Sequence, residues 1–228
     1  MHQALSEGFG AVRRALERVQ SNPQPSTVVV NAAIGFTSLY LIPRLAQFQA
    51  RFREHRVQIV TRDQNRGYDI NEADVIITFG DQGLKGLQSR PVFQEQLIPL
   101  CAPGFLANDE PVPLSALSDL PLLHMSSADH ADDWLRYFEG TGFRFPAPAE
   151  TDRIMSYMVY LYSIQNGQGV GLGWGQLVEQ MIKDRRLVKA AERVVETSRA
   201  YHANLTPQAS NNPSANAFFE WLPQTRFS

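Results

Sequence analysis

The stretch that decides the fold is VVVNAAIGFTSLYLIPRL, residues 28–45. It begins with β-branched and small apolar residues, which are typical of a buried strand, and it ends as an apolar helix. Between the two we expect a short turn formed by Phe36, Thr37 and Ser38. In open α/β sheets, ligands bind beyond the carboxyl ends of such strands, where helix amide groups point outward. The stretch supplies no activated nucleophile, base or metal-ligand set, so it predicts a small-molecule binding site rather than a catalytic one.

Composition limits the possible classes of protein. The 228 residues are 43% hydrophobic and 19% charged, which is typical of one large or two small globular domains. The net charge of −2 provides no positive field for nucleic acid or an anionic membrane. The single cysteine, Cys101, excludes an internal disulfide and fits a reducing compartment. With no run of about 18 apolar residues and no secretory pattern at the start, we expect no membrane span and a cytoplasmic location.

The order of elements predicts an α/β fold. Residues 2–20 have the periodicity of an amphipathic helix, and the proline-containing segment 21–26 reads as a linker. Strands and helices then alternate, which favours a mixed, mostly parallel sheet with helices on its faces. We expect strands at 27–33, 57–62, 74–79, 87–93, 95–101, 121–125, 151–155 and 200–205, and helices at 40–52, 131–139, 157–166, 175–184 and 214–222.

Three stretches carry a family resemblance. They are FTSLYLIPRLAQF at 36–48, ADVIITFGD at 73–81 and QNGQGVGLGW at 165–174, and the closing AFFEWL at 217–222 also fits. In this order the chain resembles the effector-binding domain of the LysR-type transcriptional regulators. The resemblance implies a fold like that of type II periplasmic binding proteins. Two Rossmann-like subdomains with mixed sheets would surround a central ligand cleft, with two crossover strands near 98–101 and 198–202 as the hinge.

The same resemblance implies a domain plan and partners. Residues 1–26 would be the end of a linker helix and a linker, residues 27–100 and 201–228 subdomain I, and residues 101–200 subdomain II. The family's helix-turn-helix should precede the linker helix, so we expect this chain to be a fragment that contacts DNA only through that missing module. We also expect a homodimer or homotetramer in which residues 41–52 lie against residues 175–184 of a partner.

The resemblance also indicates which positions face the ligand. They follow strand ends in both subdomains, and they are Phe36, Thr37, Ser38, Gln64, Asn65, Asp81, Ser126, Ser127 and Trp174. Each has a plainer alternative: Thr37 and Ser38 could only cap the helix that follows them, and Ser126 and Ser127 could cap the next helix along the chain.

Asp81 bears on the class of ligand. Family members that bind dicarboxylates carry a basic residue at the matching place, whereas an acid would repel an anion and attract a cation. The alternative is an aspartate that only forms the turn after its strand. Aromatic residues, among them Tyr157 and Trp174, could pack around a cation or could simply be core. The effector hypothesis is therefore an amine, an amino acid or a quaternary ammonium compound.

Two other classes of protein remain as alternatives. A transporter's solute-binding protein shares the fold but works outside the cytoplasm. An enzyme could use Ser126 or Ser127 with His124 or His130 and Asp129, but no nucleophile elbow accompanies them. No histidine pair has metal-ligand spacing. We therefore expect no catalytic residues, no metal and no other cofactor.

Overall fold

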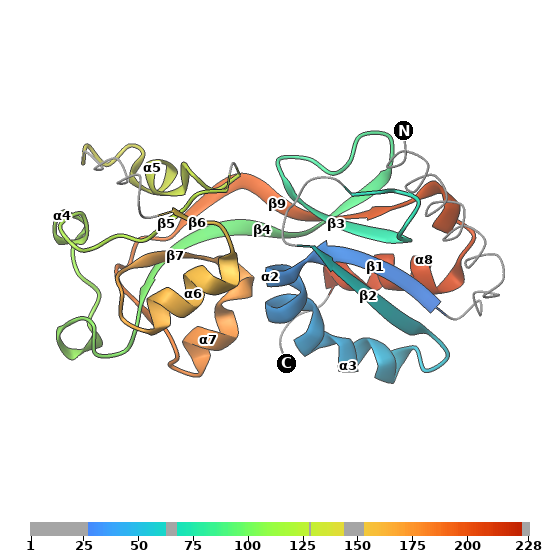
Figure 1. Cartoon of the computed structure of the whole chain (residues 1–228), viewed down its shortest axis with the longest axis horizontal. Helices are drawn as coiled ribbons and strands as arrows, with labels where there is room; N and C mark the ends of the chain where they lie inside the picture. Colours follow the sequence, from blue (N-terminus) through green and yellow to red (C-terminus); the bar gives the residue numbers. More distant parts are fainter. Residues whose placement is uncertain (1–26, 63–67, 128, 144–152, 225–228) are drawn as a thin grey trace, which may run out of the picture.

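The structure is a computed structural model that describes residues 27–62, 68–127, 129–143 and 153–224. The helix expected at 2–20 and the linker at 21–26 lie outside these residues. The described part of the chain forms two lobes joined by two long strands (Figure 1).

The first lobe is built on three parallel strands. β1 (Thr27–Ala33) pairs with both β2 (Arg56–Arg62) and β3 (Val75–Gly80). Buried residues alternate at the start of β1, because successive side chains of a strand point to opposite faces. Helices α3 (Ile42–Arg51) and α8 (Pro213–Trp221) belong to this lobe (Figure 1). Phe48 of α3 packs edge-on against Phe218 and Trp221 of α8, with ring centroids 5.4 and 5.0 Å apart.

Two strands connect the lobes. β4 (Gln88–Cys101) and β9 (Val195–Leu205) are antiparallel partners that run from one lobe into the other (Figure 1). β9 also pairs antiparallel with β3, and β4 pairs antiparallel with β7 (Gly171–Trp174) and β8 (Val188–Lys189). The order β2-β1-β3-β9-β4-β7 therefore forms one mixed sheet that spans both lobes.

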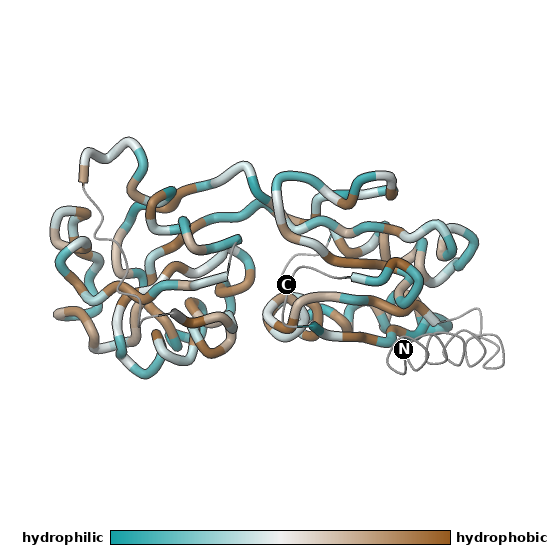
Figure 2. Tube along the Cα trace, turned by 45° about the horizontal axis from the view of Figure 1, so that its top comes forward, coloured by the Kyte–Doolittle hydropathy of each residue, from teal (hydrophilic) through white to brown (hydrophobic). Residues whose placement is uncertain are grey.

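The second lobe contains shorter elements. They are α4 (Leu114–Leu117), β5 (His124–Met125), α5 (Asp133–Phe138), β6 (Arg153–Ile154), α6 (Tyr157–Gln165) and α7 (Glu179–Lys183), with 3-10 turns at Ala107–Asp109 and Gly175–Leu177. β5 and β6 form a separate parallel pair. Seen from a second direction, the lobes still meet only at a narrow middle (Figure 2). Among the described residues, no helix is both long and apolar enough to cross a bilayer.

The sequence predicted this α/β, two-lobed architecture with crossover strands, and the structure confirms it; several local expectations were wrong. Phe36, Thr37 and Ser38 form no turn, because the chain enters α2 (Ile34–Phe36) directly from β1 and continues through a π-helical turn (Thr37–Leu41) into α3. The runs 87–93 and 95–101 are one continuous strand. The helix expected at 175–184 is a 3-10 turn followed by α7, and the strand at 121–125 is only two residues long.

Candidate functional site

An irregularity in the crossover strands creates the most unusual feature of the molecule. On one side of it Gln94 pairs with Ala200, and on the other Gln96 pairs with Glu196. Between these pairs β4 contributes only Glu95, whereas β9 contributes Thr197, Ser198 and Arg199. Extra residues on one strand bend it and re-aim its side chains. Here Glu95 and Arg199 both point into the protein and are 0% and 6% exposed.

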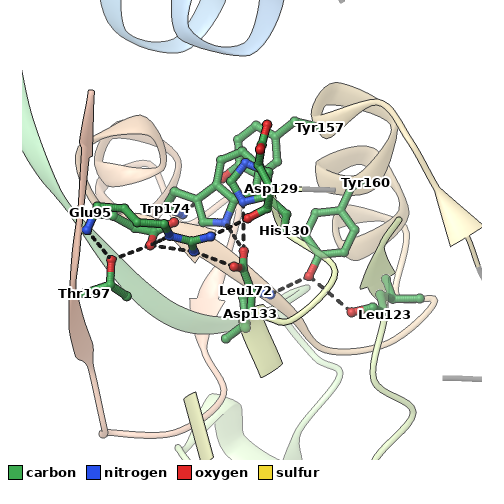
Figure 3. Close-up of polar contacts among 11 residues, drawn as sticks. Glu95, Leu123, Asp129, His130, Asp133, Tyr157, Tyr160, Leu172, Trp174 and Thr197 are labelled. Carbon is green, nitrogen blue, oxygen red and sulfur yellow. Dashed lines mark hydrogen bonds and ion pairs between the residues drawn. The ribbon is translucent and has the colours of Figure 1, made fainter. Parts of the chain in front are cut away.

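Arg199 joins two carboxylates from different elements. Its Nε donates to Glu95 Oε2 at 2.8 Å, and its Nη2 lies 2.7 Å from the same oxygen. Nη2 also donates to Asp133 Oδ1 of α5 at 2.5 Å, and Nη1 donates to the backbone carbonyl of Asp129. Thr197 adds a hydroxyl donor to Glu95 at 2.6 Å (Figure 3). The guanidinium therefore ties the second lobe to both crossover strands.

Asp133 continues this network into the aromatic part of the second lobe. Its Oδ2 lies 3.0 Å from His130 Nδ1 and accepts from Trp174 Nε1 at 3.2 Å (Figure 3). We call Glu95, His130, Asp133, Thr197 and Arg199 the hinge cluster.

The hinge cluster holds two carboxylates, one guanidinium and an imidazole that carries charge only when protonated. Two buried carboxylates share one guanidinium, and Glu95 Oε1 is a buried atom with no hydrogen-bond partner. Burial raises the pKa of Glu95, and the neighbouring Asp133 carboxylate raises it further, against the opposing effect of Arg199. Burial alone would lower the pKa of Arg199, but the carboxylates of Asp133 and Glu95 outweigh it and raise that pKa. The two carboxylates thus favour the charged form of Arg199, whereas burial disfavours the charged form of Glu95.

The hinge cluster has the residue types of a metal site but already contains a cation. Atoms of Glu95, His130 and Asp133 lie within 4.8 Å of one another. A metal ion would have to bridge the two carboxylates, and Arg199 Nη2 already occupies that bridging position at 2.7 and 2.5 Å. The donor set therefore fits an internal arginine better than a bound divalent ion.

Stacked rings link the hinge cluster to the contact between the lobes. The Trp174 ring lies between Tyr157 at 3.7 Å and His130 at 3.8 Å, with interplanar angles of 6° and 19°. His130 also stacks on Phe79 of β3 at 4.9 Å, so a ring of the second lobe touches a ring of the first. Because both faces of Trp174 are covered, it has no face open to a cation in this conformation. The place expected for Trp174 at the ligand therefore stays a prediction.

Two tyrosines of α6 hold the glycine-rich strand β7. The Tyr157 hydroxyl accepts from the Trp174 backbone N–H at 3.1 Å, and the Tyr160 hydroxyl accepts from Leu172 N–H at 2.6 Å. Gly171 allows this approach, because a Cβ there would lie 2.7 Å from the Tyr160 hydroxyl oxygen. Burial raises the pKa of both tyrosines well above its ordinary value, so both hydroxyls stay protonated. Tyr157, expected at the ligand, is a buried packing residue here.

Three predicted hydroxyl groups are buried without partners. Thr37 is 3% exposed, and its Oγ1 makes no hydrogen bond; it lies in the π-helical turn that follows β1. The hydroxyls of Ser126 and Ser127, in the loop after β5, also lack partners. Neither the π-helical turn, nor α3 after it, nor α5 receives a side-chain cap, so the capping alternative is not what the structure shows. Buried polar atoms are normally satisfied, and π-helical turns often mark functional positions.

The other predicted positions differ in their exposure. Phe36 is fully buried among Tyr40, Phe93 and Tyr201, whereas Ser38 is half-buried. Asp81 is exposed after β3, where its Oδ1 accepts from Ser198 Oγ at 2.5 Å. Gln64 and Asn65 lie outside the described residues.

The serine, histidine and acid expected as an alternative triad are not arranged as one. His130 Nδ1 lies 3.0 Å from Asp133 Oδ2, and neither Ser126 nor Ser127 uses its hydroxyl in a hydrogen bond. Their backbone groups are engaged instead: the Ser126 N–H donates to the Ile154 carbonyl at 3.0 Å, and the Ser127 carbonyl accepts from the N–H groups of His130 and Ala131 at 2.9 and 3.0 Å.

Comparison with known proteins assigns a family to this architecture. A family model described as the LysR substrate binding domain matches residues 21–226. The chain belongs to this family. It is an effector-binding domain of the LysR-type transcriptional regulators, as the resemblance predicted, and not a transporter's solute-binding protein. Proteins of this family are transcriptional regulators, not enzymes.

Curated relatives of this LysR domain are transcriptional activators. The glycine cleavage system transcriptional activator of Escherichia coli K12 is 24% identical over 221 residues, which cover 96% of this chain and 71% of that protein. The activator AmpR of Rhodobacter capsulatus is 28% identical over 223 residues, 96% of this chain and 73% of its own length.

Solved structures share the fold of the LysR domain. The effector domain of AmpR from Pseudomonas aeruginosa superposes with a TM-score of 0.71 at 24% identity, over 87% of this chain and 94% of that one. Full-length AphB of Vibrio cholerae has a TM-score of 0.71 at 15% identity, over 97% of this chain and 77% of that one.

Proposed function

We propose that this LysR domain binds a small-molecule effector between its two lobes and thereby modulates transcription as part of a longer, cytoplasmic regulator that contacts DNA through another module. The observation that carries the proposal is the set of unpartnered buried hydroxyls on Thr37, Ser126 and Ser127. Thr37 belongs to the first lobe and the two serines to the second, so one ligand that bonded to all three would hold the lobes together. An effector that binds one arrangement of the lobes more tightly shifts the population toward it.

The domain boundaries follow from the same proposal. We assign residues 27–100 and 201–228 to the first lobe and residues 101–200 to the second, with the hinge where β4 and β9 cross. No catalytic role is proposed for any residue, and no cofactor.

For the class of effector we propose an amine, an amino acid or a quaternary ammonium compound. Glu95 and Asp81 supply negative charge near the crossover strands, and Arg199 is already committed to two carboxylates. A thermal-shift screen should compare amino acids and choline-like compounds with dicarboxylates. Stabilisation by dicarboxylates alone would contradict this class of effector without affecting the interlobe site.

Thr37→Val and Ser126→Ala test the site itself. Each variant removes one hydroxyl that would hydrogen-bond to the effector, so we expect each to weaken binding of a stabilising compound by about fivefold. Isothermal titration calorimetry measures this loss. Ser118→Ala is the matched control, because Ser118 is half-buried and its hydroxyl donates to the Ser115 carbonyl at 3.1 Å. Equal affinity in all three variants would place the effector elsewhere.

We also propose that the domain self-associates as a homodimer or homotetramer through α6. Met155, Val159 and Tyr162 are 65%, 54% and 55% exposed and recur at helical spacing, and Ile42 of α3 is 55% exposed. The exposed residues of α7 are charged or amide side chains instead, so these exposures favour pairing of α3 with α6 over the pairing with 175–184.

Val159→Glu should therefore raise the dissociation constant of the dimer by at least about tenfold, because it places a charge in an apolar contact. Analytical ultracentrifugation measures the change. The control is Gln180→Glu on α7, which adds the same charge at an exposed position. A larger effect of Gln180→Glu would instead place the interface at residues 175–184.

A further inference from the structure

The hinge cluster is covered by a residue of the opposite lobe. Phe79, near the end of β3, stacks on His130 at 4.9 Å, and the guanidinium carbon of Arg199 lies 5.0 Å from the centre of the Phe79 ring. His130 and Asp133 belong to the second lobe, whereas Phe79 belongs to the first. Contact between the lobes therefore contributes to the burial of the hinge cluster.

A second contact between the lobes joins α2 of the first lobe to α6 of the second. A Cβ at Gly35 of α2 would lie 3.1 Å from Cδ1 of Tyr157 of α6, so these helices already touch. The lobes therefore touch both at Phe79 and His130 and between α2 and α6, and we call this the closed arrangement.

This closed arrangement is energetically unfavourable for the Glu95 carboxylate. Its Oε1 is buried without a partner, and Arg199, the single cation of the described residues in contact with it, is shared with Asp133. A buried polar atom without a partner destabilises the state that buries it, and more so when it is charged. When Phe79 moves away from His130, water can reach the cluster and solvate the carboxylate.

We propose that Glu95 is a conformational brake, whose charge disfavours closure of the lobes and so keeps the domain responsive to its effector. This regulation rests on the proposed function, since only an effector gives closure a biological meaning. The brake itself is a property of the chain without effector or DNA. A domain that closed fully on its own would leave an effector no equilibrium to shift.

Other groups around Glu95 shape this brake. Thr197, Arg199 and Tyr201 approach it from β9, Asp133 from α5, and His130 from the turn before α5. Protonation of Glu95 removes the same charge as substitution by glutamine, and burial favours that protonation. Acidification should therefore close the unmodified domain as the substitution does.

Glu95→Gln tests the brake in the effector-free domain. The amide keeps an oxygen that accepts from Arg199 and Thr197 but removes the excess charge, leaving Arg199 paired with Asp133. We expect a smaller radius of gyration by small-angle X-ray scattering and about tenfold slower hydrogen–deuterium exchange in the backbone of 129–138. Glu196→Gln is the control, because Glu196 is an exposed acid of β9 outside the cluster.

The opposite result would identify Glu95 as only a structural partner of Arg199. In that case Glu95→Gln would expand the domain or speed exchange, and either outcome overturns the proposal.

The unmodified domain gives an independent measurement. Its radius of gyration should fall on acidification, because the raised pKa of Glu95 favours protonation, and Glu95→Gln should abolish that change. A pH response that persists in Glu95→Gln belongs to another group and also overturns the proposal. None of these measurements depends on the effector, so the effector site can fail separately.

Discussion

Arg199→Met is expected to lower the free energy of unfolding by about 3–5 kcal/mol, because it leaves two buried carboxylates without their cation. Glu95 and Asp133 are 0% and 4% exposed, so water cannot replace the guanidinium while the lobes are closed. Methionine keeps much of the volume and removes the charge. Urea unfolding followed by circular dichroism measures the loss.

The matched control for this prediction is Arg185→Met. The Arg185 side chain is 74% exposed, and its Nη2 lies 3.3 Å from Asp109 Oδ2 at the surface. Exposed ion pairs contribute at most about 1 kcal/mol. Equal losses from Arg185→Met and Arg199→Met would contradict the assignment of Arg199 as the tie between the second lobe and the crossover strands.

Trp174→Ala is expected to lower the free energy of unfolding by about 3–5 kcal/mol. The substitution opens a cavity between Tyr157 and His130 and leaves Asp133 with one donor fewer. Thermal unfolding monitored by calorimetry measures this loss. The effect should extend to the hinge, because His130 loses a ring that positions it against Phe79.

Two comparison variants separate the loss of ring stacking from the loss of the hydrogen bond to Asp133. Trp174→Phe retains a ring for stacking but removes the Nε1–H donor to Asp133, so its loss should be intermediate. Leu135→Ala removes an apolar side chain of α5 that is 56% exposed, and it should change stability by less than about 0.5 kcal/mol. If Trp174→Phe lowered the free energy of unfolding as much as Trp174→Ala does, the loss would not come from the stacked rings.

The fold was largely predictable because its signals are local. Apolar runs bounded by turn residues located β1, β3 and the second half of β9, and the helices expected at 157–166 and 214–222 correspond to α6 and α8. The boundary after β1 was missed, since Thr37 and Ser38 are common in turns but here continue a helix through a π-helical turn. That difference matters for the site: within the helix, the Thr37 hydroxyl neither caps nor bonds, and it stays available.

The hinge cluster was missed because its partners are far apart in sequence. Glu95 and Arg199 are separated by 104 residues, and no spacing rule links them. One local signal was present. Phe93, Glu95 and Leu97 share one face of a strand by the two-residue period, and the outer two are apolar and buried. A single acid on such a face predicts a buried partner, although it cannot say which cation supplies it.

The positions of the three hydroxyls were predicted from the family resemblance rather than from a local sequence signal. Serine and threonine are common at strand ends, so Thr37, Ser126 and Ser127 carried no distinctive local signal. Their significance comes from burial without partners, which only three-dimensional packing reveals. Asp81 and Trp174 show the reverse: both suggested a cation site, but Asp81 is exposed beside Ser198 and Trp174 is covered on both faces.

Hydrogen–deuterium exchange, with and without a compound that stabilises the domain in the thermal-shift screen, tests the interlobe site most directly. We expect simultaneous protection of 36–41 in the first lobe and 124–127 in the second, because one ligand would bond to hydroxyls in both. Protection confined to one lobe would contradict this account. So would protection limited to the groove of about 450 Å³ on α5, which is lined by Asp132, Leu135, Arg136, Phe138, Glu139 and Phe143.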